Sequence, residues 1–349
     1  MKVHKCIFER IISLENLFLA WEEFRRGKSA RQDVQEFEWK LEQNIFSLYR
    51  DLRSRQYKHG AYKGFMICDP KQRRIHKASV RDRVLHHAVF KILNPIFEPT
   101  FIAHSFSCRE GKGTHKAVDA LTRFLRKTSR NYTSRCFALK CDIHQFFASV
   151  DHAILLSILG RTIKDADALW LLREIVESFR TPGNPDDDCK GIPIGNLTSQ
   201  LFANLYMNEF DQLMKQQLRV KQYVRYTDDF IMVAADKSDL EKLLPPMRDF
   251  LREKLRLSLH PRKIILRKLG QGIDFLGYVI LPHHRALRSR TKRRMFRKLH
   301  LRVVSLKVGK GSESSVESSL QSYLGVLSHA NTHRLTEQLK NQYWFWMSE

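Results

Sequence analysis

The chain has 349 residues, and its 61 Lys and Arg against 37 Asp and Glu give a formal net charge of +24. Apolar residues make up 43% of the sequence and aromatic residues 11%, which is enough for a packed core and excludes intrinsic disorder. A folded protein with this positive charge is expected to bind something anionic, either nucleic acid or an anionic membrane.

A membrane explains the charge less well than nucleic acid does. The longest apolar runs, such as 230–235, cover about six residues, far short of the roughly 20 that a membrane helix needs. The basic N-terminus is not followed by a signal-peptide cleavage site. The six cysteines form no C-x-x-C pair or zinc spacing. We therefore expect buried, reduced thiols, a cytoplasmic location and no membrane association.

The first 60 residues predict helices, and the next segment predicts strands. Apolar side chains recur at helical spacing within 7–56, and strand-like runs lie between 61 and 76 around a turn at Asp69-Pro70. A helix is predicted from Val84 to Ile92, with its end near Pro95. The apolar positions of the early helices are Leu14, Leu17, Phe18, Trp21, Phe37, Trp39, Leu41, Ile45 and Leu48.

The middle of the chain alternates apolar strands with helices. A strand is predicted from Cys136 to Ile143, a helical region over 154–179, and a turn over 191–200 that leads into a helix. Residues 223–235 predict a tight hairpin with Thr227-Asp228-Asp229 at its tip. A further helix is predicted from 240 to 255, followed by a strand that contains Phe275, Gly277 and Val279.

The last segment is strongly basic. Residues 285–310 hold 11 Lys or Arg and no acidic residue, while Met295, Phe296, Leu299, Val303 and Leu306 repeat at helical spacing. This pattern predicts an amphipathic helix that packs by one face and offers cations to nucleic-acid phosphates with the other. A merely solvated basic face is the alternative.

Acidic residues at the ends of apolar strands are the main chemical signal. Asp142 ends the strand 136–143, and Asp228 and Asp229 interrupt an apolar hairpin. Carboxylates held close together in apolar surroundings repel one another, and cations relieve that repulsion. Two Mg²⁺ ions about 4 Å apart are the arrangement that catalyses phosphoryl transfer. A turn that simply favours Asp is the competing interpretation.

The full motifs resemble those of reverse transcriptases. Tyr226-Thr227-Asp228-Asp229 matches their Y-x-D-D box, residues 142–152 resemble their first palm motif, and Phe275-Leu276-Gly277-Tyr278 resembles their primer grip. The resemblance covers about residues 60 to 340. It implies an α+β fold shaped like a right hand: an N-terminal helical extension (1–60), fingers (61–135), a palm with an antiparallel sheet (136–282, with a helical insertion at about 154–190) and a helical thumb (283–349).

One motif narrows the class. Most relatives carry Q-G-x-x-x-S-P where this chain has Ile194-Gly195 and Ser199-Gln200. The I-G-x-x-x-S-Q form is similar to that of diversity-generating retroelement reverse transcriptases of bacteria and phages. That resemblance implies an enzyme that copies a template-repeat RNA into cDNA with errors opposite adenines. It also implies a small basic accessory variability protein as partner, deoxynucleoside triphosphates as substrates, and diversification of a target gene.

The resemblance assigns roles to individual residues. Asp142 and Asp228 are expected to hold two Mg²⁺ ions (Mn²⁺ is an alternative), with Asp229 as a third carboxylate and the Ile143 carbonyl as a further ligand. The residues expected to contact the incoming nucleotide are Lys71, Arg74, Phe147, Ile194, Gly195 and Lys263, with Phe147 as the gate against the 2′-hydroxyl. The residues expected along the template and primer are Arg109, Gly111, Gln200, Phe275, Leu276, Gly277, Tyr278, Arg293, Arg294, Arg297 and Lys298.

Alternatives stay open at this point. A group II intron maturase shares the palm motifs, although we expect it to extend past the thumb, and this sequence stops at Glu349. A retron or defence-associated reverse transcriptase fits the length but does not account for Ile194 and Gln200. A catalytically inactive palm that only binds RNA belongs to a different class, and the presence of all three palm aspartates disfavours it.

Overall fold

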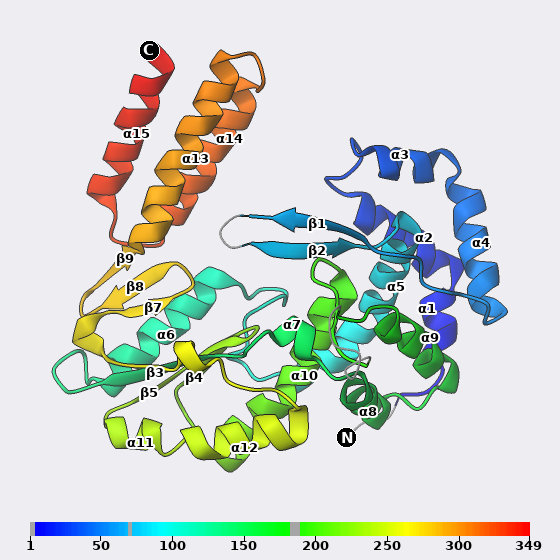
Figure 1. Cartoon of the computed structure of the whole chain (residues 1–349), viewed down its shortest axis with the longest axis horizontal. Helices are drawn as coiled ribbons and strands as arrows, with labels where there is room; N and C mark the ends of the chain where they lie inside the picture. Colours follow the sequence, from blue (N-terminus) through cyan, green and yellow to red (C-terminus); the bar gives the residue numbers. More distant parts are fainter. Residues whose placement is uncertain (1–3, 69–71, 182–188) are drawn as a thin grey trace.

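The computed structural model describes residues 4–68, 72–181 and 189–349. Helices and antiparallel sheets alternate along this chain, which confirms the predicted α+β class. In Figure 1 the N-terminal helices lie on the right and the C-terminal helices at the upper left, with one sheet between them and the other sheets below the C-terminal helices. The described residues include no helix that is both long and apolar enough to cross a membrane.

The N-terminal helices pack around one long central helix. They are α1 (Phe8–Ile12), α2 (Leu14–Arg25), α3 (Gln32–Trp39) and α4 (Leu41–Arg53), and all four contact α5 (Val80–Phe97). Leu17, Trp21 and Leu48 are buried in this cluster, as their spacing predicts. The expectation for Trp39 is wrong, because its side chain stands at the end of α3 and is 86% exposed.

Helix α5 is longer than the sequence pattern predicts. Ser79 caps its N-terminus, with Oγ accepting a hydrogen bond from the Asp82 backbone N–H at 3.1 Å, so the helix begins at Val80 and not at Val84. It also continues past Pro95 to Phe97. A proline this close to the end removes only one backbone hydrogen bond, and a short 3₁₀ turn, η1 (Glu98–Thr100), follows directly.

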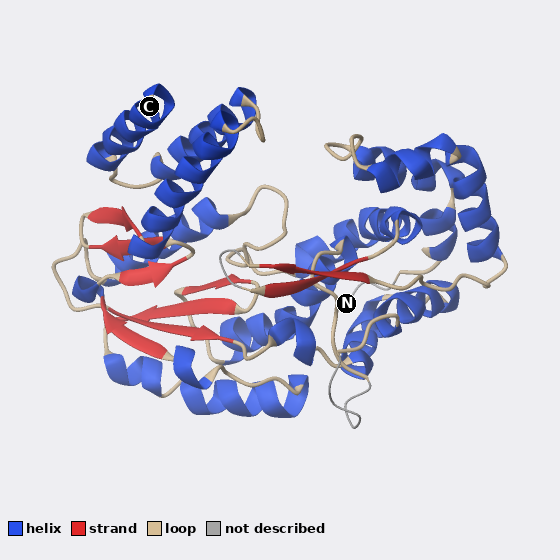
Figure 2. Cartoon of the chain, turned by 45° about the horizontal axis from the view of Figure 1, so that its top comes forward, coloured by secondary structure: helices blue, strands red, loops and turns tan. Residues whose placement is uncertain are grey.

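A two-stranded hairpin stands apart from the other sheets (Figure 2). Its strands β1 (Lys63–Ile67) and β2 (Arg73–Lys77) pair antiparallel, with Lys63 opposite Lys77. We call it the finger hairpin, and its two strands match the strand-like runs predicted over 61–76. Most of its side chains are exposed, so it projects from the helical core.

The palm sheet contains four antiparallel strands in the order β4-β5-β3-β6. Strand β3 (Phe137–Asp142) is central, β4 (Tyr223–Tyr226) and β5 (Asp229–Ala234) form the predicted hairpin, and β6 (Ile265–Lys268) is the edge. Helix α6 (Thr114–Thr128) contacts β4 and β5, and α11 (Lys237–Glu241) contacts β3 and β5. The strand at 136–143 and the hairpin tip at 227–229 are therefore where the sequence predicts them.

Two predicted helices are each divided in two. The region 154–179 forms two helices, α8 (His152–Thr162) and α9 (Ala166–Glu177). The chain breaks at Asp165, because one carboxylate oxygen of this residue caps α9 and the other accepts backbone N–H groups at the start of α1. The region 240–255 begins as α11 and continues as α12 (Leu244–Leu255), whose first turn contains both prolines. The remaining palm elements are α7 (Phe146–Ser149), α10 (Leu197–Gln212), a π-helical turn η3 (Leu213–Gln217), and the 3₁₀ turns η4 (Pro261–Lys263) and η5 (Leu269–Gln271).

A second sheet joins the palm to the C-terminal helices. Its strands β7 (Ile273–Phe275), β8 (Tyr278–Leu281) and β9 (His284–Leu287) are antiparallel neighbours. The single strand predicted through Gly277 is thus a hairpin, because Leu276 and Gly277 both have positive φ and turn the chain. The basic segment also begins as a strand, β9, before its helix starts at Ser289.

Three helices form the C-terminal bundle: α13 (Ser289–Lys307), α14 (Glu313–Leu327) and α15 (His333–Ser348). Met295, Leu299 and Val303 are buried against the other two helices, which confirms the amphipathic pattern of α13. The expectation for the cysteines is wrong in part. Cys136 and Cys141 are buried, whereas Cys6, Cys68, Cys108 and Cys189 are exposed.

Candidate active site

The three palm aspartates meet where β3 and β5 end. The antiparallel register places Asp142 directly opposite Asp229. The Ile143 backbone N–H donates to the Asp228 carbonyl oxygen at 3.2 Å, which fixes the hairpin tip against the end of β3. Thr227 turns the chain with a φ of 56°. Strand pairing therefore brings together residues that are 86 positions apart in the sequence.

The carboxylates act on one another electrostatically. Burial raises the pKa of Asp228, and the nearby Asp142 raises it further. Burial also raises the pKa of Asp229 to about 6, with Lys140 opposing the shift and Asp142 and Asp228 adding to it. Burial and neighbouring negative charge thus disfavour the ionised forms of Asp228 and Asp229, so a bound cation is favourable beside them.

Two lysines neutralise part of this charge. Lys263 Nζ lies 2.8 Å from Asp142 Oδ1, and Lys140 Nζ lies 3.0 Å from Asp229 Oδ2. The turn that carries Lys263 is held in place because the His260 backbone N–H donates to the Asp142 carbonyl oxygen at 2.8 Å. The structure thus brings Lys263 to the aspartates. Lys140 is an additional site residue that the motif comparison did not identify, although its place on an apolar strand two residues before Asp142 was a visible signal.

The donor set suits a hard divalent cation. Asp229 Oδ1 is buried and has no hydrogen-bond partner among the described residues, so it offers an unused carboxylate oxygen. Carboxylate and carbonyl oxygens are the ligands that Mg²⁺ prefers. Within the described ranges, however, no three His, Cys, Asp or Glu side chains are arranged closely enough to hold a metal ion. Lys140 and Lys263 each occupy one oxygen of a candidate ligand. The role of the Ile143 carbonyl stays a prediction.

Strand β2 carries two neighbouring arginines whose side chains lie on opposite faces. The charge of Arg73 opposes part of the rise in the pKa of Asp228. Arg74 is the next residue on the strand, so its side chain points to the opposite face, where it lies against Gly64. Arg73 is therefore an additional candidate, and the period-two alternation of β2 was the signal for it, while the nucleotide contact of Arg74 stays a prediction. Lys71 lies outside the described residues.

The loop that contains Ile194 and Gly195 packs against the finger hairpin. The His76 backbone N–H donates to the Ile194 carbonyl oxygen at 3.2 Å, and Asn196 Nδ2 donates to the His76 carbonyl oxygen at 2.9 Å. Gly195 has a φ of 110°, and a Cβ there would lie only 2.9 Å from Ile75 Cγ2. Glycine is needed for both reasons. Gln200, on the following helix, lines a cavity with Gly195 beside β2.

The two phenylalanines of α7 have different environments. Phe146 is buried in the core, with 2% of its surface exposed, whereas Phe147 is half-buried and packs against it at a ring-centroid distance of 5.4 Å. Phe147 is thus the member of the pair that can contact a ligand. Its role as a sugar gate stays a prediction.

Arg109 holds its own loop together. Its guanidinium contacts Glu98 at 2.8 Å and donates to the carbonyl oxygens of Ile102 and Ser105 at 2.7 and 2.8 Å, and its side chain is 6% exposed. A group with these partners positions the loop and does not reach out to a template strand, which corrects the expectation from sequence. Gly111, with a φ of 67°, turns the same loop at the surface.

The primer-grip motif forms the turn between β7 and β8. Phe275 and Tyr278 are core residues, 0% and 2% exposed, and the Tyr278 hydroxyl donates to the Val326 carbonyl oxygen at 2.9 Å. Only Leu276 and Gly277 are available at the surface, so direct primer contact is restricted to the turn. The Arg288 backbone N–H donates to the Gly277 carbonyl oxygen at 2.9 Å, which joins this turn to the start of α13.

The four basic residues predicted to contact nucleic acid lie on α13. Arg293 and Arg297 are exposed, and Arg294 and Lys298 are half-buried and have partners within the chain. None of the four belongs to the buried face of this helix, which contains Met295 and Leu299. Their contact with template and primer stays a prediction.

Comparison with known proteins agrees with this geometry. Residues 58–280 match the family model described as reverse transcriptase (RNA-dependent DNA polymerase). The chain belongs to the reverse transcriptase family, and the enzyme class predicted from the motifs, RNA-directed DNA polymerase, is confirmed at the level of that family.

The similar proteins include intron-encoded ones. Protein YkfC of Escherichia coli is 24% identical over 253 residues, covering 61% of this chain and 63% of that protein. Group II intron-encoded protein LtrA of Lactococcus lactis is 22% identical over 262 residues, covering 57% of this chain and 43% of that protein. The putative COX1/OXI3 intron 2 protein of Saccharomyces cerevisiae is 20% identical over 256 residues, covering 57% of this chain and 29% of that protein. The chain thus spans less than two thirds of each of these proteins.

Proposed function

We propose that this chain is an RNA-directed DNA polymerase that copies a template-repeat RNA into cDNA with errors at adenines, as part of a diversity-generating retroelement. The observation that supports the polymerase activity is the meeting of Asp142, Asp228 and Asp229 at the ends of two paired strands within a reverse transcriptase domain. The template RNA, the growing DNA strand and deoxynucleoside triphosphates are its proposed ligands.

The proposed chemistry is transfer of a nucleotidyl group to a 3′-hydroxyl. Asp142 and Asp228 would hold two Mg²⁺ ions, which Mn²⁺ could replace, and Asp229 would be a third carboxylate beside them. Bound there, the ions stabilise the charge that develops on the attacking and leaving oxygens. Lys263, 2.8 Å from Asp142, is placed to donate a proton to the leaving pyrophosphate. Arg73 and Lys140 add positive charge around the same carboxylates.

The narrower class is supported by the motif loop beside the finger hairpin. Ile194 stands where most relatives have Gln, and its backbone is bonded to β2, the strand that carries Arg73. An apolar side chain at the junction of fingers and palm removes an amide that accurate relatives have near the incoming nucleotide. A small basic accessory variability protein, a bacterial or phage origin and a cytoplasmic location follow from the same proposal.

A group II intron-type enzyme is the second candidate. LtrA is named as a group II intron-encoded protein, and it is 22% identical over 57% of this chain. A retron or a defence-associated enzyme shares the palm but not the Ile194 and Gln200 pattern. A palm that only binds RNA is the alternative from a different class.

Primer extension on a synthetic RNA template tests the proposal. The wild-type chain should extend a DNA primer, whereas Asp228→Ala should lose extension and keep RNA binding, because affinity comes mainly from Lys and Arg on phosphates. Extension by Asp228→Ala close to the wild-type rate would contradict the assigned site. Sequencing the cDNA made on an adenine-rich RNA separates the classes: errors concentrated opposite adenine support the retroelement class, and an even error spectrum contradicts it.

A further inference from the structure

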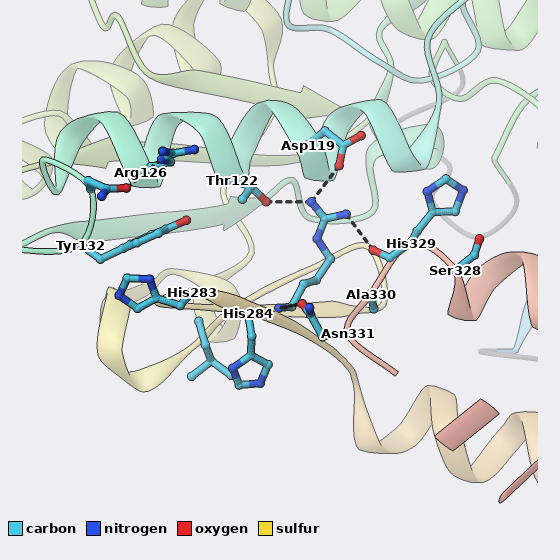
Figure 3. A pocket seen from close by; sticks show the side chains of 13 residues that line it. Asp119, Thr122, Arg126, Tyr132, His283, His284, Ser328, His329, Ala330 and Asn331 are labelled. Atoms are coloured by element: carbon cyan, nitrogen blue, oxygen red, sulfur yellow. Dashed lines mark hydrogen bonds and ion pairs between the residues drawn. The ribbon is translucent and has the colours of Figure 1, made fainter. Parts of the chain in front are cut away.

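A polar pocket lies away from the palm aspartates, at the junction of α6, the β8–β9 turn and the α14–α15 connection (Figure 3). It has a volume of about 650 Å³, within the range typical of small-ligand sites. Its position is set by β3. The loop that lines the pocket precedes this strand, and Asp142 ends it, so the six residues of β3, on the order of 20 Å in length, lie along the chain between the two sites.

The walls of the pocket are polar and cationic. Its lining includes two arginines, Arg126 and Arg285, and a single acidic residue, Asp119, and the only aliphatic side chains in the lining are Leu281 and Ala330. The other lining residues are Thr122, Asn131, Tyr132, His283, His284, Ser328, His329 and Asn331. This composition excludes an apolar ligand and favours an anionic one that also carries hydrogen-bonding groups.

One arginine builds the pocket and the other is available to a ligand. Arg285 is fixed by Asp119 at 2.7 Å, Thr122 at 3.0 Å and the His329 carbonyl oxygen at 2.9 Å, so it joins the C-terminal bundle to α6. Arg126 is exposed, and among the described residues only its Nε is bonded, to Asn131 Oδ1 at 2.9 Å. Its terminal nitrogens can therefore form the two-pronged contact that a phosphate group accepts.

Aromatic rings occupy the same end of the pocket as Arg126 (Figure 3). Tyr132 and His283 meet edge to face, with ring centroids 4.7 Å apart. Arg130, Asn131, Tyr132 and His283 all have positive φ, between 49° and 72°. Such conformations are costly for non-glycine residues and tend to persist where a functional arrangement requires them.

The surroundings of the pocket point to a nucleic-acid strand and not to a free small anion. From Arg126 to Arg135 the chain has four basic residues and no acidic one. A run of cations beside an aromatic platform is the combination that binds single strands, since phosphates meet the cations and an unstacked base meets the rings.

We propose that this pocket binds an unpaired nucleotide of the RNA that carries the template, outside the catalytic cleft. The inference rests on the proposed function, because during copying the new DNA is paired with its template, and the unpaired nucleotides belong to RNA that is not being copied. Arg126 contacts a phosphate, and the Tyr132–His283 pair receives the base. Because the walls come from α6 and from the α14–α15 connection, bound RNA also holds these two parts of the chain together.

Equilibrium binding of a fluorescein-labelled, unstructured 20-nucleotide RNA tests the proposal on the full chain, with excess unlabelled RNA–DNA hybrid filling the catalytic cleft. Tyr132→Ala should weaken binding roughly 5- to 150-fold, the range for loss of base stacking on an aromatic ring. Arg126→Gln loses the phosphate contact and should weaken binding more than Arg123→Gln does. Tyr132→Phe keeps the ring and should bind as the wild type does. Arg123→Gln removes the same charge from the same helix outside the pocket, and should change affinity less than about threefold.

Three results would overturn the proposal: equal weakening by Arg123→Gln and Arg126→Gln, loss of RNA binding when the hybrid is added, or tighter binding of DNA of the same sequence. If Tyr132→Ala does not fold, cross-linking of 4-thiouridine RNA to the wild type and to Arg126→Gln decides the question, with cross-links expected at Tyr132 or His283. Extension of a pre-annealed primer by Arg126→Gln should equal that of the wild type. If the wild type binds this RNA but extends no primer, the proposed polymerase function is contradicted, whereas RNA binding at the pocket is not.

Discussion

Lys140 and Asp229 form an ion pair across the centre of the palm sheet, with Nζ 3.0 Å from Oδ2. Lys140 is on β3 and Asp229 begins β5, and both side chains are less than 20% exposed. Lys140 also donates to the Asp274 carbonyl oxygen at 3.2 Å, and the Asp274 carboxylate contacts Arg288. The pair therefore links a candidate catalytic carboxylate to the strand before the primer-grip turn and to the base of α13.

Replacing Lys140 should destabilise the fold through Asp229. Lys140→Met leaves a largely buried carboxylate without a cation, and one oxygen of that carboxylate already lacks a hydrogen-bond partner. We expect the free energy of unfolding in urea to fall by about 2 kcal/mol, less than the ~3–5 kcal/mol typical when a fully buried ion pair loses one partner.

A double-mutant cycle separates this effect from a general loss of packing. Asp229→Asn removes the buried charge, so the double variant with Lys140→Met should lose less stability than Lys140→Met alone. Losses that simply add would show that the two side chains do not interact. Lys140→Arg keeps the charge and serves as the matched control.

The sequence predicted the parts of the site that depend on local pattern. Asp142 at a strand end and Asp228 at a hairpin tip follow from alternation and turn chemistry. The partners of the palm aspartates could not be predicted from local pattern, because Lys140 contacts Asp229 only through the pairing of two strands that lie 89 positions apart in the sequence. Motif matching selected Arg74 and did not consider Arg73, whose charge acts on Asp228 from the other face of β2.

The fold shows the same division between local and long-range causes. The helical periodicity of α13 predicted its buried residues correctly. The strand β9 was not predicted, because it forms by pairing with β8. Its four residues, with one arginine, carry no local signal of that pairing. The break between α8 and α9 depends on Asp165, which caps one helix and accepts hydrogen bonds from residues near the N-terminus.

The exposed arginines of α13 should contribute to RNA affinity through charge alone. Neutralising Arg293 and Arg297 to Gln should reduce the slope of log K against log salt by about 1.5, since each lost phosphate contact removes about 0.7 to 0.9. Filter binding at several salt concentrations measures the slope. Lys242→Gln with Lys254→Gln is the matched control and should leave the slope unchanged; Lys242 directly follows α11 and Lys254 lies on α12, and Figure 1 shows both helices on the opposite side of the palm from α13. An unaltered slope in the arginine variant would mean that this face is only solvated.

The two phenylalanines of α7 should respond differently to truncation. Phe147→Ala opens space at a half-buried position, so incorporation of ribonucleotides should rise relative to deoxyribonucleotides in single-nucleotide extension. Phe146→Ala removes a buried ring, so it should instead lower the free energy of unfolding by about 3–5 kcal/mol. A gain of ribonucleotide incorporation in a folded Phe146→Ala, with none in Phe147→Ala, would reverse the assignment.

Ile194 should lower the accuracy of copying. Its carbonyl oxygen is bonded to the His76 backbone N–H, so replacing the side chain leaves the loop attached to the finger hairpin. A Gln at this position offers an amide that penalises a misplaced base pair, because a buried donor or acceptor left unmet costs about 1–3 kcal/mol. Isoleucine fills space but offers no such group. A difference of roughly 1.4 kcal/mol in discrimination corresponds to about a tenfold change in error frequency.

Sequencing cDNA from wild type and Ile194→Gln on one adenine-rich RNA, with the accessory protein present, measures this effect. Misincorporation opposite adenine should fall about tenfold in Ile194→Gln while extension persists; the special sensitivity of adenine is implied by the resemblance to diversity-generating enzymes. Ile194→Leu keeps an apolar side chain of the same volume and should retain the wild-type error spectrum. If Ile194→Gln and Ile194→Leu give the same spectrum as the wild type, Ile194 marks the class without causing its errors, and the source of infidelity lies elsewhere in the palm.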